Sequence, residues 1–338
     1  MIENKGLVSF IIPTYNREEF VEECIDSVLK QSYQNFEIVI VDDGSLDNTY
    51  EICKRLAKDE PRIKLFKSSH GGVSVARNIA LDEALGEYVF FLDSDDVIHP
   101  CLIESFVRGM EENKATIAAT RVANVRPNLW HKFREKCKEQ NVIGELTYID
   151  ADGVVDSMIN GSDSPIGCIG GIMMHRNLIG STRFKEDIYI GEDFYFIYEN
   201  IIKGATGAFL TQKWYYARIH ENNSSWDYSF NGFWTRFYRR KLVWESEEML
   251  GRIGNSNTQK RDAYRCYWLC AEKNKPYSDD CKQMRKVLKE YKSTLFPALS
   301  IRKKIEFNLY IYLPATTKFM YSLKEKIRRL LRKFKAKR

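Results

Sequence analysis

The segment Tyr88-Val-Phe-Phe-Leu-Asp-Ser-Asp-Asp96 decides the fold of this 338-residue chain. Its first five residues, Tyr88 to Leu92, are apolar and bounded by polar ones, which is typical of a central strand. Asp93, Asp95 and Asp96 follow where the strand stops. Carboxylates gathered at the end of a buried strand are the ligands that divalent cations prefer. The segment therefore predicts a metal site at the edge of a sheet, and hence a metal-using enzyme.

The chain before this segment alternates between two periodicities. Short β-branched or aromatic runs predict three earlier strands, at Leu7–Ile12, Phe36–Val41 and Ile63–Phe66. Apolar residues three and four apart predict helices between them, at Glu18–Gln31, Asp47–Lys58 and Val73–Leu85. A fourth helix is expected from Pro100 to about Glu112. Strands that alternate with helices indicate an α/β fold with a mostly parallel central sheet.

Composition and cysteine usage set limits on the class of protein. A hydrophobic content of 44% with 29% charge is ordinary for a folded chain of one large or two smaller domains. The cysteines form no Cys-x-x-Cys pair and no zinc-finger spacing, so reduced thiols in a cytoplasmic protein are expected. The N-terminus lacks signal-peptide features, and no apolar run approaches the roughly 18 residues of a membrane span.

The formal charge of +6 is concentrated in the last residues. Residues 324 to 338 hold nine Lys or Arg and one Glu, a local +8. Apolar residues between Phe319 and Phe334 recur at helical spacing, so residues 318–338 predict a basic amphipathic helix on an anionic membrane surface. A solvated or core-packing terminal helix is the alternative. Nucleic-acid binding is not expected, because no reader motif or interleaved basic groove is present.

Ligands of open parallel sheets bind beyond the carboxyl ends of the strands. Four polar segments follow the four predicted strands: Pro13-Thr-Tyr-Asn-Arg17, Asp42-Asp-Gly-Ser-Leu-Asp47, Ser68 to Asn78, and Asp93-Ser-Asp-Asp96. In this order and spacing they resemble the family 2 glycosyltransferases of the GT-A fold, which transfer a sugar from a nucleotide sugar to an acceptor. The resemblance covers roughly residues 7 to 225 and implies a Rossmann-like nucleotide-sugar-binding domain.

The resemblance implies a site for the donor nucleotide at the first strand ends. The residues assigned to it are Pro13, Tyr15, Asn16, Arg17, Asp42, Asp43, Gly72, Arg77, Asn78 and Asp93. Tyr15 would lie near the base. Asp43, or else Asp42, would accept the N3–H of uracil, a donor that cytosine lacks, which favours a UDP-sugar. Arg77 and Asn78 would line the donor pocket or brace the acidic cluster; the alternative is a helix entry with a solvated arginine.

The resemblance also assigns the metal and the catalytic residues. Asp95 would bind Mn²⁺ or Mg²⁺, with His220 as a further ligand, and Arg218 would contact the diphosphate. Asp193 would be the general base of an inverting transfer, and Glu192 would raise its pKa or orient the acceptor. The alternatives are an N-cap cluster before Pro100, a capping pair that opens a helix at Phe194–Ile202, and a surface-polar histidine.

Three expectations concern the whole chain. The domain assignment is 1–225 for the GT-A domain, with a nucleotide-binding half (1–120) and an acceptor and catalytic half (121–225), followed by a helical region at 226–338. The expected role is assembly of a cell-surface polysaccharide such as a capsule, on a polyprenyl-diphosphate-linked acceptor at the inner face of the cell membrane. The alternatives are a sugar nucleotidyltransferase and a membrane-surface binding module without activity. The sequence leaves open the sugar, the linkage, polymerisation and the oligomeric state.

Overall fold

A computed structural model describes residues 4–126, 130, 142–160, 165–166, 168–188, 190–220, 229–273 and 278–312. The chain divides into two compact units, Met1–Asn223 and Ser224–Arg338, which we call the sheet unit and the helical unit. The predicted boundary, after residue 225, is two residues later than the boundary in the structure. The division of the first domain into a nucleotide-binding half and a catalytic half stays a prediction. The predicted basic tail, residues 318–338, lies outside the described residues.

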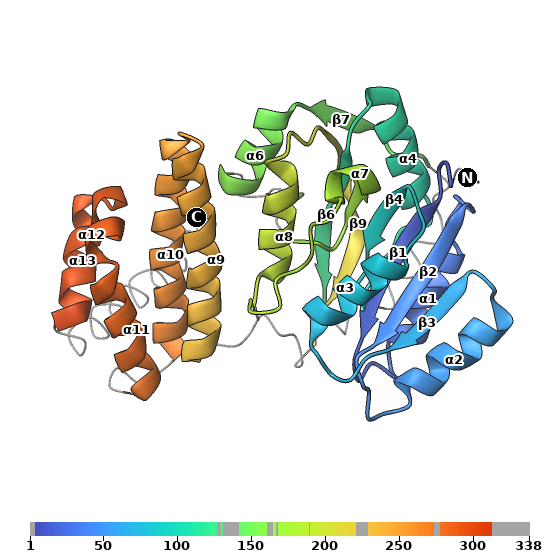
Figure 1. Ribbon diagram of the computed structural model, residues 1–338, viewed down its shortest axis with the longest axis horizontal. Helices are drawn as coiled ribbons and strands as arrows, with labels where there is room; N and C mark the ends of the chain where they lie inside the picture. Colours follow the sequence, from blue (N-terminus) through green and yellow to red (C-terminus); the bar gives the residue numbers. More distant parts are fainter. Residues whose placement is uncertain are drawn as a thin grey trace, which may run out of the picture. The chain divides into compact units, whose positions relative to one another are not determined.

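The first half of the sheet unit is parallel. Strands β1 (Val8–Thr14), β2 (Phe36–Asp42), β3 (Ile63–Lys67) and β4 (Tyr88–Phe91) lie in the order β3-β2-β1-β4. Helices α1 (Val21–Leu29), α2 (Thr49–Asp59) and α3 (Val73–Glu83) connect them (Figure 1). These are the strands and helices that the sequence pattern predicts, each shifted by a few residues at its ends.

Beyond β4 the sheet becomes mixed. Strand β8 (Ile172–His175) is antiparallel to both β4 and β6 (Ile117–Val125), and it separates them. Strand β9 (Gly207–Arg218) is parallel to β6 and pairs in antiparallel fashion with β5 (Val97–Ile98) and β7 (Leu146–Ile149). The helices of this half are α4 (Leu102–Asn113), α6 (Ala151–Asn160), α7 (Arg176–Ile179) and α8 (Glu192–Ile201). The middle of the chain is thus more regular than its sequence suggests.

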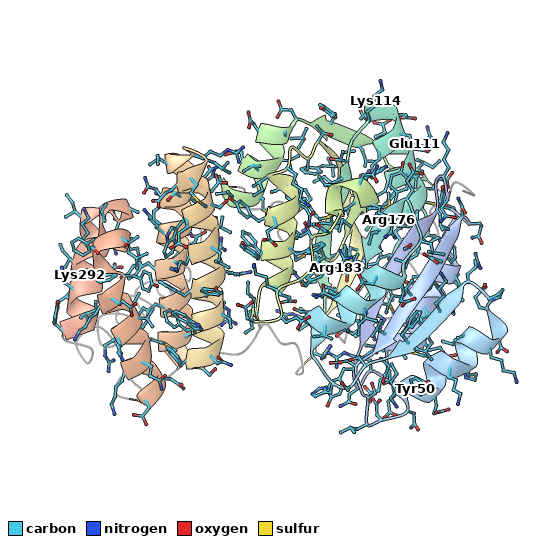
Figure 2. The ribbon with its side chains drawn as sticks, viewed as in Figure 1. Tyr50, Glu111, Lys114, Arg176, Arg183 and Lys292 are labelled. Carbon is cyan, nitrogen blue, oxygen red and sulfur yellow. The ribbon has the colours of Figure 1, made fainter. Side chains whose placement is uncertain are left out.

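Close packing and two arginines tie the halves of the sheet unit together. Phe10, Phe90 and Phe106 are fully buried in one core cluster. A Cβ on Gly86 would lie 2.6 Å from the Ser9 nitrogen, so only glycine fits there. Arg176 Nε donates to the Gly86 carbonyl at 2.5 Å, and Arg183 pairs with Asp82 at 2.6 Å. Figure 2 labels both arginines.

The helical unit contains α9 (Phe230–Met249), α10 (Ile253–Lys273), α11 (Asp279–Glu290), α12 (Lys292–Leu295), a 3₁₀ turn at Phe296–Ala298 and α13 (Ile301–Tyr312). Phe233, Phe237 and Trp244 are at most 1% exposed and belong to its aromatic core. The aromatic segment of α9 therefore contributes packing to this unit. Within the described residues, no helix combines the length and apolar character needed to cross a membrane.

Candidate active site

The predicted site segments meet at the carboxyl edge of the parallel strands. Thr14 and Asp42 are register partners at the ends of β1 and β2, and β4 stops at Phe91 just before the acidic run. Strand β1 extends through Thr14, so Pro13 lies inside the strand rather than after it. Segments that are far apart in sequence reach the same edge because the strands run in one direction.

Asp42 and Asp43 shape the turn after β2. Asp42 Oδ1 accepts from the backbone nitrogens of Gly44 at 3.2 Å and Ser45 at 3.0 Å. Asp43 accepts from the backbone nitrogens of Gly71 and Gly72, each at 2.8 Å. The Asp43 carboxylate thus already organises the loop before α3, and its contact with a base stays a prediction. Gly72 has φ +91°, a backbone conformation that residues with a side chain rarely adopt. Glycine at this position therefore allows the backbone conformation in which the Gly72 N–H donates to Asp43.

Tyr15 lies against His70, with ring centroids 4.4 Å apart. The His70 ring nitrogen Nδ1 is 3.0 Å from the Asp43 carbonyl oxygen. Asn16 Oδ1 accepts from the Leu46 nitrogen at 2.8 Å, which joins the turns after β1 and β2. His70 is a site residue that the sequence does not reveal, because a histidine in a Ser-His-Gly-Gly loop gives no sign of an aromatic partner fifty-five positions earlier in the chain.

Arg77 is the central cation of the edge. Its guanidinium donates to Asp93 at 2.9 Å and to Glu192 at 2.8 Å, and the residue is 4% exposed. Burial would lower the pKa of Arg77, but Asp93, Glu192 and Asp193 raise it well above its ordinary value. Burial, aided by the charge of Asp193, raises the pKa of Glu192 even though Arg77 opposes the shift. Arg77 therefore braces the strand end against the start of α8.

Asp95 is held by two cationic or polar groups. Its Oδ2 accepts from Arg17 Nε at 3.1 Å and lies 2.8 Å from His220 Nε2. Burial would raise the pKa of Asp95, but His220 and Arg17 overcome it and hold the pKa below its usual range. The structure thus brings together Asp95 and His220, which the sequence assigns to a metal, although 125 positions separate them.

Asp96 and Tyr215 are buried beside the acidic run. Asp96 is 5% exposed, and its Oδ1 accepts from the Arg218 nitrogen at 2.8 Å. Burial, with the charges of Asp95 and Asp93 added, raises the pKa of Asp96 well above its ordinary value. The Tyr215 hydroxyl accepts from the Asp93 nitrogen at 3.2 Å. Tyr215 gives no signal in the sequence, because an aromatic residue inside a strand normally indicates packing.

Arg218 lies between two aromatic rings. Its guanidinium carbon is 4.7 Å from the Phe20 ring centroid and 3.9 Å from that of Trp130, and its NH2 pairs with Glu23 at 2.6 Å. Trp130 Nε1 also donates to Glu23, at 3.1 Å. These contacts position Arg218 beside Asp95, whose carbonyl oxygen accepts from its Nε at 3.1 Å. Its contact with a diphosphate stays a prediction.

Asp193 and Glu192 form the first turn of α8, after Gly191 at φ +86°. The Asp193 carboxylate accepts from the backbone nitrogens of Phe194 at 2.6 Å and Ile169 at 3.4 Å. Burial raises the pKa of the neighbouring Cys168 thiol to about 12, and the charges of Asp193 and Asp93 add to the shift. Asp193 therefore shares the edge with the strand-end carboxylates.

The Asn78 side chain makes two hydrogen bonds to the backbone of Phe184. Its Oδ1 accepts from the Phe184 nitrogen at 2.8 Å, and its Nδ2 donates to the Phe184 carbonyl at 3.0 Å. The side chain thus fixes the segment that leads to α8, and a direct contact with the donor stays a prediction. Within the described ranges, no group of three His, Cys, Asp or Glu residues is arranged to hold a metal ion by itself.

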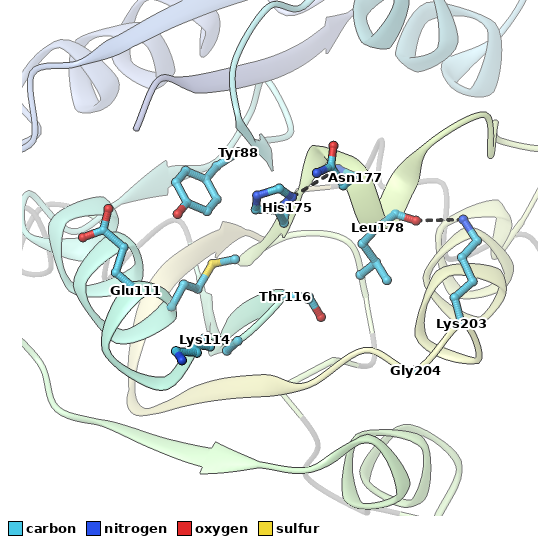
Figure 3. Close-up of a pocket in the computed structure, with 11 residues that line it drawn as sticks. Tyr88, Glu111, Lys114, Thr116, His175, Asn177, Leu178, Lys203 and Gly204 are labelled. Atoms are coloured by element: carbon cyan, nitrogen blue, oxygen red, sulfur yellow. Dashed lines mark hydrogen bonds between the residues drawn. The ribbon is translucent and has the colours of Figure 1, made fainter. Parts of the chain in front are cut away.

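An open pocket of about 520 Å³ lies at the amino end of β4 (Figure 3). Its lining residues come from the start of β4, the end of α4, the end of β8, helix α7 and the turn after α8, among them Tyr88, Glu111, Lys114, His175 and Lys203. None of the predicted site residues lines it. The pocket is therefore separate from the acidic edge.

Comparison with known proteins identifies a known domain within the sheet unit. Residues 9–166 match the domain described as Glycosyl transferase family 2. Glycosyltransferase GlyG of Streptococcus pneumoniae is 38% identical over 112 residues, covering 33% of this chain and 37% of that protein. Glycosyltransferase GlyA of the same organism is 29% identical over 237 residues, covering 63% and 33%. The aligned part thus spans about a third of the length of these relatives.

Solved structures show the same fold. S. aureus TarS in complex with UDP-GlcNAc superposes with a TM-score of 0.59 at 19% identity, covering 94% of this chain and 92% of that one. The mannosyltransferase PcManGT of Pyrobaculum calidifontis, in complex with GDP-Man and Mn²⁺, gives 0.51 at 15% identity, covering 92% and 86%. The predicted GT-A fold and the resemblance to the family 2 glycosyltransferases are confirmed, and the family match lies at residues 9–166.

Proposed function

We propose that this protein transfers a sugar from a UDP-sugar to a hydroxyl group of a saccharide acceptor. One observation carries the proposal: Arg77, buried, bonds both Asp93 at the strand end and Glu192 at the start of α8. This bridge joins the segment that the family uses for the donor to the segment assigned to the acceptor. A binding module has no evident need to hold two carboxylate groups against each other at the cost of burying their charges.

The proposed reaction is a single displacement with inversion. The acceptor hydroxyl oxygen bonds to the anomeric carbon as the bond to the β-phosphate oxygen breaks, and the nucleoside diphosphate leaves with that electron pair. Asp193 takes the hydroxyl proton. The Asp193 carboxylate is half-buried and oriented by two backbone N–H groups, which fits a base that must remain in one position.

The residues fit a divalent cation, Mn²⁺ or Mg²⁺, that donor phosphates complete. Asp95 and His220 would hold the ion, because a carboxylate oxygen and an imidazole nitrogen are ligands that such a cation accepts. Asp95 Oδ2 and His220 Nε2 are 2.8 Å apart. Arg17 Nε, 3.1 Å from the same oxygen, would have to share it or move. The ion would neutralise charge on the departing diphosphate. The Mn²⁺ in PcManGT supports this assignment.

The donor and acceptor proposals rest on different observations. The UDP-GlcNAc in TarS, together with the Tyr15–His70 ring pair, supports a uridine nucleotide as the donor. The basic, amphipathic sequence of residues 318–338 supports a lipid-linked acceptor and a peripheral location on the inner face of the membrane. A role in assembling a cell-surface polysaccharide, such as a capsule, belongs to the same proposal.

Calorimetric binding of UDP, GDP, CDP and dTDP, each with and without Mn²⁺, tests the donor side. Metal-dependent binding that prefers UDP is expected. Asp95→Asn should weaken the metal-dependent part, whereas Asp59→Asn, an exposed residue at the end of α2, should not. If no nucleotide binds to folded protein, the proposal fails and a membrane-surface binding module becomes the better account.

A further inference from the structure

Helix α13 of the helical unit has an exposed apolar face. Ile301 is 78% exposed, Ile305 56% and Tyr312 60%. At 100° per residue these three and the half-buried Leu309 fall within about 80° of arc. Exposed isoleucines on successive turns of one helix face are unusual, because a surface helix normally places polar residues on its solvent-facing side. We call this set the α13 stripe.

The opposite face of α13 explains why the stripe is not part of the core. Phe307 and Ile311 are 1% and 5% exposed and belong to the aromatic core of the helical unit. The Phe307 ring lies 5.3 Å from Tyr264 and 5.7 Å from Phe296, measured between centroids. The helix is therefore anchored by one apolar face and presents a second.

Positive charge surrounds the α13 stripe. Lys292 Nζ lies 5.4 Å and Lys289 Nζ 5.7 Å from the Tyr312 ring centroid, and Figure 2 labels Lys292 at the start of α12. Arg302 and Lys304 flank the stripe on α13 itself. Residues 279 to 312 contain eight Lys or Arg against four Asp or Glu, a net +4. An apolar strip bordered by basic side chains is the pattern of a helix that lies in a membrane interface.

We propose that the α13 stripe docks on an anionic lipid surface. A second copy docked stripe against stripe would place like charges against each other, whereas lipid phosphates complement them. The chain also continues from α13 toward a segment with nine Lys or Arg among residues 324 to 338. The inference deepens the proposed membrane location of the reaction and rests on it, but it does not depend on the donor chemistry.

Flotation of the full-length protein with vesicles tests the inference. The vesicles contain either phosphatidylcholine alone or phosphatidylcholine with phosphatidylglycerol. The wild type should bind the anionic vesicles, and Ile301→Ser/Ile305→Ser should weaken this binding about tenfold with the basic tail still present. The matched control is Met249→Ser/Ile253→Ser, which changes two exposed apolar residues at the α9–α10 turn (83% and 55% exposed) and should bind as the wild type does.

Other outcomes overturn the inference. Unchanged flotation of the α13 variant, with binding lost only when residues 318–338 are deleted, would assign docking to the tail alone. Equal losses in the α13 variant and the control would indicate general adhesion. A dimeric wild type that the variant makes monomeric, with unchanged flotation, would assign the stripe to self-association. UDP binding is measured on every variant, so loss of vesicle binding with UDP binding retained separates this inference from the donor proposal.

A second variant keeps the test decisive if the serine variant does not fold. Arg302→Gln/Lys304→Gln retains the apolar residues and removes two flanking charges. It should reduce binding to anionic vesicles and remain less salt-sensitive than the wild type. Binding by this variant at wild-type strength and with wild-type salt dependence would contradict the inference.

Discussion

The acidic edge of the sheet unit and the helical unit both bury charged side chains, but they satisfy them over different distances along the chain. At the edge, Arg77 bonds Glu192 from 115 positions away, and His220 reaches Asp95 across 125. In the helical unit, the fully buried Glu247 accepts from Asn255, eight positions on. Local pairs form as two helices meet, whereas remote pairs need the complete fold. Remote, buried pairs of charges are therefore the ones to test for function.

The largest expected effect separates chemistry from structure at the edge. Asp193→Asn should reduce transfer from a UDP-sugar by about 10² to 10⁴ fold, because the base is lost. UDP affinity and melting temperature should stay close to those of the wild type. Asp187→Asn, an exposed residue a few positions earlier, is the control. A variant that retains near-full activity would show that Asp193 is only a residue of the first helical turn.

The next effect tests whether the remote network also stabilises the fold. Arg77→Met should lower the free energy of unfolding by about 3 to 5 kcal/mol near neutral pH, because Asp93 and Glu192 lose their common cation. The loss should shrink at lower pH, where the raised pKa of Glu192 lets it become neutral. Urea unfolding at neutral and at lower pH measures both the loss of unfolding free energy and its dependence on pH.

Two comparison variants sharpen this result. Arg77→Met/Glu192→Gln should recover part of the loss, since one unpaired charge is removed. Arg55→Met breaks an exposed pair with Glu22, at 53% and 57% exposure, and should cost less than about 1 kcal/mol. Equal costs for Arg77→Met and Arg55→Met would remove the distinction between buried and exposed pairs.

A smaller effect concerns a group that the sheet unit buries without charge. His99 is 3% exposed, stacks on Trp214 at 4.1 Å, and its Nδ1 accepts from the Cys101 nitrogen at 3.2 Å. Burial lowers its pKa to about 4. Below the unfolded pKa of about 6.5, the unfolded chain takes up a proton that the folded chain refuses, so stability falls as the pH drops toward 4.

A matched variant isolates the contribution of His99 to the pH dependence of stability. His99→Asn can accept the same N–H bond and does not titrate. Between pH 7.5 and pH 5, the wild type should lose about 2 kcal/mol more stability than the variant. An identical pH dependence in the two proteins would show that His99 is protonated in the folded state.

The smallest effect belongs to the helical unit. Glu247→Gln keeps an acceptor for Asn255 and leaves Arg252, which is 33% exposed, in contact with water. A loss of about 1 kcal/mol in unfolding free energy is expected. A loss as large as that of Arg77→Met would contradict the distinction between local and remote pairs, because the local pair of the helical unit would then stabilise the fold as much as the remote one.

The sequence predicted the parallel half of the fold and the members of the acidic edge. Parallel strands all end at the same edge of the sheet, so Asp42, Asp95 and their neighbours reach that edge whatever the details of side-chain packing. It could not give the partners of Arg218 or the ring contact between Tyr15 and His70, since these depend on distance in the folded structure and not on spacing along the chain. It also missed the antiparallel entry of β8 between β4 and β6, because four residues, Ile172–His175, carry too little periodicity to identify their neighbours.

That entry of β8 has a consequence for synthesis of the chain. Strand β4 ends at Phe91, yet the strand that covers its outer side begins at Ile172, about eighty residues later. At roughly 5 to 20 residues per second, the aromatic edge of β4 stays unpaired for about 4 to 16 seconds after it emerges from the ribosome. During that interval the nascent chain exposes an open strand that can pair with another copy. Chaperone protection of chains stalled between residues 120 and 170 is the expected sign of this delay.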